Sequence, residues 1–354
     1  MTARSLLSSS GHDFCHAMNQ TSAKQPRIAM NAEARLVGDI GGTRARLAWQ
    51  DARGAALRAI STYRLCDFPT PLALLRHYLA EHGLPAPAAI CLGVASALEG
   101  DEVQLTNAQW RFSLRALGRA LGVDRIWAIN DFAALANAVP LLDERQRKLM
   151  GGSTPDLTRP IVVLGPGTGL GLASLVPTGA GSWIVVPGQG GHVTLPATSD
   201  RQWALIACLQ RRFGHVSAER VLSGAGLLNT AQALALIDGR PAPEYAEPSE
   251  VTEGARQGDP ICTEAVALFA FFLGVVAGNA ALTLGARGGV YVGGGVVHRL
   301  GSLFDWGRFR EGFEAKGRLS PWLVAIPTYW ILDELAALQG AARALDGLLS
   351  TAEA

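Results

Sequence analysis

The chain has 354 residues, of which 49% are hydrophobic and 17% are charged. At roughly 150 residues per domain, this length predicts two domains with their own cores, and the composition excludes a chain that is disordered throughout. Lys and Arg number 31 and Asp and Glu 30, giving a net charge of +1. This balance argues against a dedicated nucleic-acid-binding protein, because such proteins carry a basic excess.

The first 34 residues differ from the rest of the chain. Residues 1–34 are rich in small and polar residues without strand or helix periodicity, so we expect a disordered N-terminal extension, with Met18 and Met30 as alternative start positions. Its apolar run is too short for a signal peptide; a transit peptide is the alternative. The five cysteines are scattered and form no Cys-x-x-Cys pair. We therefore expect neither a disulfide framework nor a zinc site. The scattered cysteines favour a reducing, cytoplasmic compartment.

The order of the expected elements is that of an α/β protein. Apolar runs predict two strands around a glycine turn at residues 34–49, and further strands at residues 88–95, 103–106, 125–130, 161–164, 172–176, 182–186 and 289–292. Helical patterns predict helices at residues 71–82, 114–121, 131–139, 201–213, 226–237, 300–313 and 335–349. Because strands followed by helices dominate, the fold class is α/β.

One uncharged segment is long enough to cross a membrane. Residues 265–286 form a run of 22 residues without a charge, which meets the length criterion for a transmembrane helix. The second half of this run is only weakly hydrophobic, and no basic cluster flanks one end to set an orientation. We therefore expect a helix buried inside a large α/β domain, with a membrane span as the alternative.

Three glycine-rich strand ends carry the clearest chemical signal. Asp39 precedes glycines at 41 and 42, residues 165–171 hold four glycines, and residues 288–295 form a third cluster. Glycines let backbone N–H groups approach an anion closely, and an acid at a strand end can hold the water shell of Mg²⁺ against phosphates. The second cluster fits neither a P-loop nor the Rossmann fingerprint. Together they suggest one polyphosphate nucleotide gripped from two sides, with three unrelated turns as the alternative.

Seven motifs, in order along the chain, resemble those of the bacterial glucokinase family. They read LVGDIGGTRARLAW, AINDFAALANAVP, VVLGPGTGLGLA, PGQGGHV, SAERVLSGAGLLN, GGVYVGGGVVHR and AKGRLSPWLVAIPTY. The resemblance covers the chain from about Leu36 to the C-terminus. It implies an α/β, two-lobed actin-like/ribonuclease H-like (hexokinase-type) fold with a central cleft. The implied activity is the Mg²⁺-dependent transfer of the γ-phosphate of ATP to the 6-hydroxyl of glucose.

The resemblance also implies a domain organisation and a set of partners. The expected small α/β domain comprises residues 35–141 plus 332–354, and the expected large α/β domain residues 142–331. The expected substrate is a small-molecule sugar, glucose, with neither nucleic acid nor membrane as a partner. A homodimer is the assembly that the family resemblance implies.

The site residues implied by the resemblance fall into three groups. Asp131 is the expected catalytic base, which orients the sugar hydroxyl and accepts its proton; a helix N-cap is the alternative role. The expected sugar-binding residues are Asn107, Asn130, Asp131, Gln189, His192 and Glu219. The expected nucleotide-binding residues are Asp39, Gly41, Gly42, Thr43, Gly167, Thr168, Gly169, Gly294 and Gly295, with Asp39 also expected to bind Mg²⁺ through water.

Two positions depart from the family pattern. The first motif usually has Asn where this chain has Arg44, and the sugar motif usually has Glu where it has Gln189. A Gln keeps an acceptor oxygen but loses the charge, which weakens hydrogen bonds to sugar hydroxyls. A catalytically weak sugar sensor on the same fold and a kinase for another hexose are therefore the alternative functions. The Cys-rich zinc motif of the related repressor-and-kinase sugar kinases is absent from the sequence.

Overall fold

The computed structural model describes residues 33–96, 98, 100–105, 110–179, 181–241 and 245–352. In it, a five-stranded sheet forms the centre of the first lobe. The predicted N-terminal extension lies almost entirely outside these residues. The strand order is β3-β2-β1-β4-β7, in which β1, β4 and β7 run parallel and β2 and β3 are antiparallel to their neighbours. Their bounds are β1 Arg35–Ile40, β2 Arg44–Gln50, β3 Leu57–Arg64, β4 Ala89–Val94 and β7 Arg125–Asn130.

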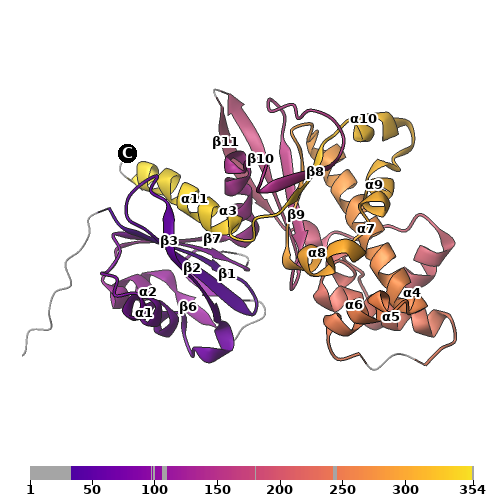
Figure 1. Ribbon diagram of the computed structural model, residues 1–354, viewed down its shortest axis with the longest axis horizontal. Helices are drawn as coiled ribbons and strands as arrows, with labels where there is room; N and C mark the ends of the chain where they lie inside the picture. The colour runs from indigo at the N-terminus through magenta and orange to yellow at the C-terminus, as the bar shows by residue number, and fades with distance from the viewer. Residues whose placement is uncertain are drawn as a thin grey trace, which may run out of the picture.

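A six-stranded sheet forms the centre of the second lobe (Figure 1). The strand order is β11-β10-β9-β12-β13-β8, with β9, β12 and β13 parallel to one another. The bounds are β8 Arg147–Gly151, β9 Ile161–Pro166, β10 Leu170–Gly179, β11 Ser182–Gly188, β12 Gly289–Val292 and β13 Thr328–Ile331. A small separate ribbon pairs β5 Glu102–Gln104 with β6 Arg111–Ser113.

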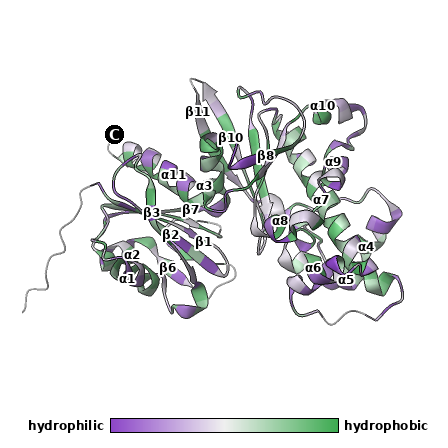
Figure 2. Cartoon of the chain, viewed as in Figure 1, coloured by the Kyte–Doolittle hydropathy of each residue, from purple (hydrophilic) through white to green (hydrophobic). Residues whose placement is uncertain are grey.

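Each face of both sheets is covered by helices, which creates four apolar layers. In the first lobe, α1 (Pro71–Glu81) and α2 (Leu114–Leu121) cover one face and α11 (Ala336–Ala352) covers the other. In the second lobe, helices gather on one side of the sheet (Figure 2), and their buried apolar residues form one cluster with residues of the sheet. Their bounds are α4 Asp200–Phe213, α5 Gly224–Ile237, α6 Pro248–Arg256, α7 Pro260–Leu284, α8 Gly295–Leu300, α9 Trp306–Glu314 and α10 Ser320–Val324.

Helix α3 (Asp131–Ala138) joins the two lobes. Ala134 belongs to the apolar layer under the first sheet, whereas Ala136 and Ala138 belong to the layer under the second. Gly340 of α11 lies so close to α3 that an added Cβ would come within 1.7 Å of the Ala134 carbonyl oxygen. Helix α3 is therefore fixed from three sides, and its first residue is held where the two lobes meet.

The uncharged segment is a core helix, as the sequence predicts. Helix α7 is long and apolar enough to cross a membrane, yet 67% of its most apolar window is buried inside the protein. Gly274 and Gly278 face α9, where added Cβ atoms would meet the carbonyl oxygens of Phe309 and Phe313 at 1.9 and 2.5 Å. Their small-residue spacing therefore serves close helix packing within this lobe.

One predicted helix is wrong. The sequence predicts a single helix at residues 300–313, but the structure has two, α8 and α9. Gly301 ends the first with a positive φ of 55°, and the Asp305 side chain caps the second by accepting hydrogen bonds from the N–H groups of residues 307 and 308. Strands β3, β6, β8 and β13 and helices α6 and α10 were not predicted, because they are short or lack a clear apolar period.

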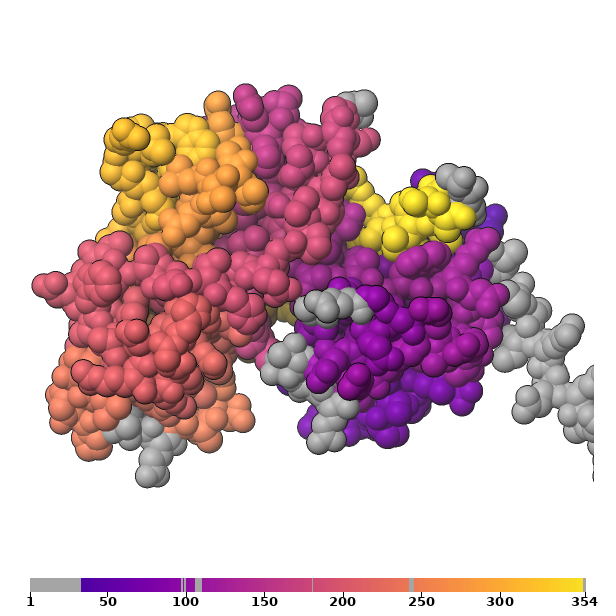
Figure 3. Space-filling model, turned by 180° about the vertical axis from the view of Figure 1, so that it is seen from behind, coloured from indigo at the N-terminus to yellow at the C-terminus, as the bar shows by residue number. Residues whose placement is uncertain are grey.

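A notch open to solvent separates the two lobes on one side of the molecule (Figure 3). All strands of the first sheet lie within residues 35–130, and all strands of the second lie within residues 147–331. The central cleft of the predicted fold corresponds to this notch. The predicted domain boundaries at 141 and 332 follow the same division and remain a prediction.

Candidate functional site

Three parallel strands of the first lobe end at the junction with the second. In register, Asp39 of β1 is paired with Gly93 of β4, which is paired with Ile129 of β7. Asp131 follows Ile129 by two residues and is the first residue of α3. The carboxyl ends of parallel strands are where α/β proteins bind ligands. Gly93 has no side chain between the two acids, so Asp39 and Asp131 lie close enough to repel each other electrostatically.

Asn130, not Asp131, caps helix α3. Its Oδ1 accepts hydrogen bonds from the N–H groups of Phe132 and Ala133 at 3.0 and 3.1 Å. Its Nδ2 donates to Asp131 Oδ1 at 3.0 Å. The alternative role of Asp131 as an N-cap is therefore wrong, since the preceding residue fills that position. The Asn130 amide instead holds the Asp131 carboxyl in a fixed orientation.

The Asp131 carboxyl has one engaged and one free oxygen. Oδ1 accepts from Asn130 Nδ2 and from the Phe132 N–H, the latter at 2.9 Å. The described residues give Oδ2 no hydrogen bond. The pKa of Asp131 is raised to about 7, first by burial and then by the negative charge of Asp39, against the opposing effect of these hydrogen bonds. A carboxyl with a pKa near neutrality and a free oxygen fits a general base.

Arg46 neutralises the second carboxylate. Burial raises the pKa of Asp39, and Arg46 opposes this rise. Arg46 Nη1 donates to Asp39 Oδ2 at 3.3 Å, while its Nη2 donates to Glu334 Oε2 at 3.1 Å. Glu334 precedes α11, at the passage from the second lobe back to the first. Arg46 therefore connects the site to the segment that joins the lobes. Its place in the first motif is the only sequence signal that could have indicated this role.

The second and third glycine clusters pack directly against each other. An added Cβ on Gly165 would come within 2.4 Å of the Gly293 carbonyl oxygen, and one on Gly294 within 2.5 Å of the Pro166 carbonyl oxygen. Gly294 also has a φ of +89°, which side chains rarely adopt. Only glycine fits at these positions, so the two clusters form one backbone surface.

The second cluster also contacts the residue after Asp131. Gly171 lies under the Phe132 ring, where a Cβ would come within 1.7 Å of a ring carbon. Gly167, by contrast, faces open space, with no atom within 4 Å of an added Cβ. The structure therefore places a glycine loop (Gly167, Thr168 and Gly169) next to the Asp131 end of α3. The loop is open at Gly167, whereas Gly169 packs against Glu219, whose Oε2 lies 2.3 Å from where a Cβ would be. Such a cradle, which a Cβ at Gly167 would begin to fill, fits the phosphates of a nucleotide.

The sugar motifs meet on the second lobe. His192 ends a short 3-10 helix (Gly190–His192), and Glu219 lies in another (Ala218–Arg220). A β-bridge between Thr194 and Ser217 holds the two segments together. Glu219 Oε2 accepts from the N–H of Leu170 at 2.9 Å, which ties this region to the glycine loop.

The remaining predicted residues are placed as follows. Gln189 and His192 are exposed, and Gln189 precedes the first 3-10 helix. Gly41 and Gly42 lie in the turn between β1 and β2, where the Gly41 N–H donates to the Arg44 carbonyl oxygen at 2.9 Å. Asn107 lies outside the described residues. Among those that are described, no three His, Cys, Asp or Glu side chains are grouped to hold a metal ion.

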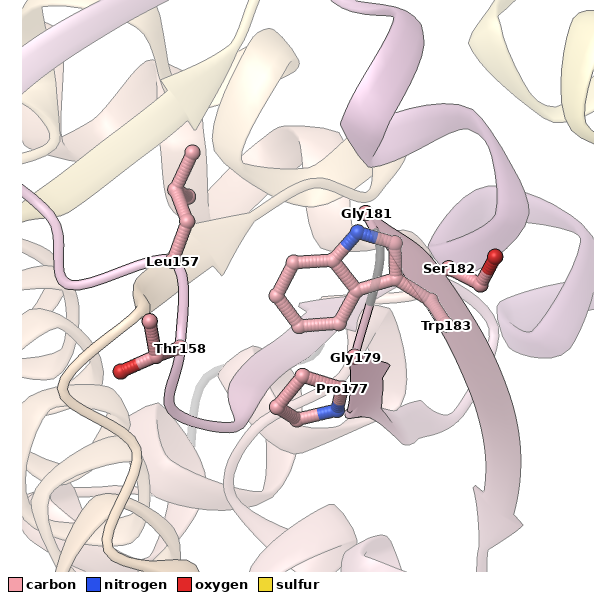
Figure 4. A pocket seen from close by; sticks show the side chains of 7 residues that line it. All are labelled: Leu157, Thr158, Pro177, Gly179, Gly181, Ser182 and Trp183. Carbon is pink, nitrogen blue, oxygen red and sulfur yellow. The ribbon is translucent and has the colours of Figure 1, made fainter.

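A small surface pocket lies elsewhere. It has a volume of about 210 Å³ and lies at the β10–β11 hairpin, where the Trp183 ring is beside Pro177 and faces Leu157 (Figure 4). None of the predicted site residues lines it. The pocket therefore has no part in the site at the strand ends.

Comparison with known proteins decides the family. The family model for Glucokinase matches residues 36–348. A glucokinase of Aromatoleum aromaticum is 46% identical over 318 residues, which are 89% of this chain and 96% of that protein. The chain belongs to the glucokinase family. The family prediction made from the seven motifs is thus confirmed, over the range in which they occur.

Other relatives agree with this assignment. A glucokinase of Paramagnetospirillum magneticum is 43% identical over 309 residues, covering 87% of this glucokinase-family chain and 96% of the relative. The crystal structure of a glucokinase from an Antarctic psychrotroph superposes with a TM-score of 0.77 at 34% identity, covering 89% of this chain and 99% of that one. A Streptomyces griseus glucokinase in complex with glucose and AMPPNP shares the fold, with a TM-score of 0.59 at 20% identity, covering 87% and 98% of the two chains. The predicted two-lobed kinase fold is confirmed.

Proposed function

We propose that this protein phosphorylates glucose at its 6-hydroxyl with ATP, and that Asp131 is the base of the reaction. One observation carries the assignment of the base. The free Oδ2 of Asp131, on a carboxyl with a pKa of about 7, lies at the junction of the lobes, and the Phe132 ring after it contacts Gly171 of the glycine cluster. Family membership supports the kinase over a sugar sensor.

In the proposed reaction, Asp131 Oδ2 accepts the proton of the sugar 6-hydroxyl. The hydroxyl oxygen forms a bond to the γ-phosphorus while the bond from that phosphorus to the β,γ-bridging oxygen breaks, so the products are the sugar phosphate and ADP. Phosphoryl transfer depends on positioning and charge stabilisation more than on covalent chemistry. The hydrogen bonds from Asn130 and Phe132 to Oδ1 supply that positioning, since they leave only Oδ2 to face the substrate.

The sugar would lie between the two lobes. Asn130 and Asp131 reach it from the first lobe, and His192, Glu219 and Gln189 reach it from the second. Glu219 already accepts one hydrogen bond through Oε2, so its Oε1 is the oxygen proposed for a sugar hydroxyl. Closure of the lobes over the sugar would exclude water and prevent hydrolysis of ATP.

The nucleotide phosphates would rest on the glycine surface. The loop at Gly167 to Gly169, which is open at Gly167, and the turn at Gly41 to Thr43 would approach them from opposite lobes, and Gly294 and Gly295 would lie on the adenosine side. The donor set also fits a magnesium ion, because Asp39 and Asp131 are neighbouring carboxylates and hard oxygen donors suit Mg²⁺. Bound Mg²⁺ neutralises charge on the phosphates, and Asp39 would hold it through water.

The proposal also covers the cellular location and the oligomeric state of the protein. A cytoplasmic location agrees with the scattered thiols, of which Cys66, Cys91, Cys208 and Cys262 are free in the described part of the chain. A homodimer without nucleic-acid or membrane partners is the proposed assembly. Gel filtration with light scattering tests the dimer.

The deciding test is ADP release over a panel of hexoses. Purified protein with ATP and Mg²⁺ is expected to release ADP fastest with glucose, and mass spectrometry should find the 6-phosphate. Omitting Mg²⁺ should abolish the signal. Glucose binding without ADP release would support the sensor instead, and faster turnover of another hexose would change the substrate.

A further inference from the structure

Arg44, one of the two residues that depart from the family pattern, lies at the junction of the lobes. It is the first residue of β2, and Arg46 follows two residues later on the same face of the strand. Between them, Ala45 belongs to the apolar layer under α1 and α2. Arg44 therefore projects from the opposite face, at the end of the strand next to the turn at Gly41 and Gly42.

The charge of Arg44 is not balanced as that of Arg46 is. Arg46 is paired with Asp39 and Glu334, whereas neither Arg44 nor its cross-strand partner Arg64 forms an ion pair within the described part of the chain. Both are exposed, and the antiparallel register places them directly opposite each other. Like charges directly opposite each other destabilise a sheet. Within the described residues, no ion pair to Arg44 or Arg64 offsets this repulsion.

A third arginine approaches from the other lobe. The Arg299 guanidinium of α8 lies over the third glycine cluster, 3.0 Å from where a Cβ on Gly295 would be. No hydrogen bond or ion pair to this guanidinium occurs among the described residues. Its pKa is lowered first by burial and then by the positive charge of Arg44, with Glu334 acting in the opposite direction. Arg299 at the third glycine cluster is thus within electrostatic reach of Arg44 beside the first.

We propose that Arg44 and Arg299 clamp the phosphates of the nucleotide from opposite lobes. This inference rests on the proposed kinase function and adds two phosphate-binding residues to it. Arginine binds phosphate through paired hydrogen bonds, and a triphosphate carries enough negative charge to relieve the repulsion between the guanidinium groups. The sugar phosphate is the less suitable anion, because Arg44 and Arg299 adjoin the first and third glycine clusters rather than His192.

The clamp has a consequence for lobe movement. Bound triphosphate would be attracted to both lobes at once, so its binding favours the closed arrangement. A nucleotide without the β- and γ-phosphates would gain little from the clamp. The phosphate dependence of binding therefore distinguishes a clamp from a structural role.

The experiment compares Arg44→Asn, Arg299→Gln, the double variant and Arg44→Lys. Each single neutral variant should raise the KM for ATP by about tenfold, the loss expected for one charge-assisted contact, with the KM for glucose unchanged. Arg44→Lys should recover part of the loss. The double variant should show less than the product of the two single effects, because both residues act on one ligand. Arg119→Gln, an exposed arginine of α2, is the charge-matched control.

Binding measurements separate this inference from the kinase function. Calorimetry should show weaker binding of ATP and ADP to Arg44→Asn and equal binding of AMP. A KM for ATP that stays within twofold of the unchanged protein would overturn the clamp, as would an equal loss of AMP affinity. If the unchanged protein released no ADP from any hexose, the proposed function would fail, yet calorimetry with ATP would still test the clamp.

Discussion

Replacing Asp131 with Asn separates the chemistry of this carboxyl from its structural contacts. The Asn side chain retains an Oδ1 that can accept hydrogen bonds from Asn130 Nδ2 and the Phe132 N–H. In the unchanged protein these two bonds to Asp131 Oδ1 measure 3.0 and 2.9 Å. It cannot accept a proton at the other position. We therefore expect kcat to fall by about 10²- to 10⁴-fold, the usual contribution of a positioned base, with sugar binding retained.

The same substitution should stabilise the fold above neutral pH. The pKa of Asp131 is raised from 3.8 to about 7, so its ionised form is disfavoured in the folded protein. At about 1.4 kcal/mol per pKa unit, the upper limit of this cost is ~4.5 kcal/mol. Because the residue is only partly buried, solvent screening reduces the cost to about 1–2 kcal/mol. The favourable contribution of the protonated form is complete below pH 4 and is lost as the pH rises through 7.

Two measurements test this reasoning. Thermal melts at pH 8 should show a higher Tm for Asp131→Asn than for the unchanged protein, with the difference vanishing near pH 4. The kcat/KM of the unchanged protein should rise with pH up to about 7 and then level off. Asp124→Asn, an exposed acid of the same lobe, is the matched control. A near-normal kcat in Asp131→Asn, or a flat profile between pH 6 and 8, would refute the role of Asp131.

Three further predictions follow from the glycine cluster, the sugar motif and the N-terminus. Gly171→Ala should lower stability by about 1–3 kcal/mol in denaturant unfolding, because its Cβ would meet the Phe132 ring; the matched Gly167→Ala, which meets no atom, should keep the Tm and raise only the KM for ATP. Gln189→Glu should lower the KM for glucose by up to about tenfold with little change in kcat, and an unchanged KM would contradict the assigned contact. Deleting residues 1–30, which lie outside the described residues, should leave Tm and activity intact; loss of soluble protein would show that they are needed.

Much of the fold follows from local sequence patterns. The bounds of α2, β7 and β12 are as predicted, because each is an apolar run or an amphipathic period ended by a clear signal, such as Gly122 in the left-handed conformation after α2. The prediction fails at residues 300–313, where an amphipathic pattern continues across the break at Gly301. A period of apolar residues does not reveal a change of helix direction when the turn itself is short.

For the candidate site, the sequence by itself determined the family, the motif order and which residue types carry the chemistry. It did not determine how those residues are held. That Asn130 caps α3 and frees Asp131 depends on the backbone conformation at one strand end. Arg46 and Glu334 are separated by 288 positions, and Arg44 and Arg299 belong to different lobes. Such pairs form only when two sheets pack against shared helices, so no local pattern encodes them, and only the tertiary structure decides which charges are balanced.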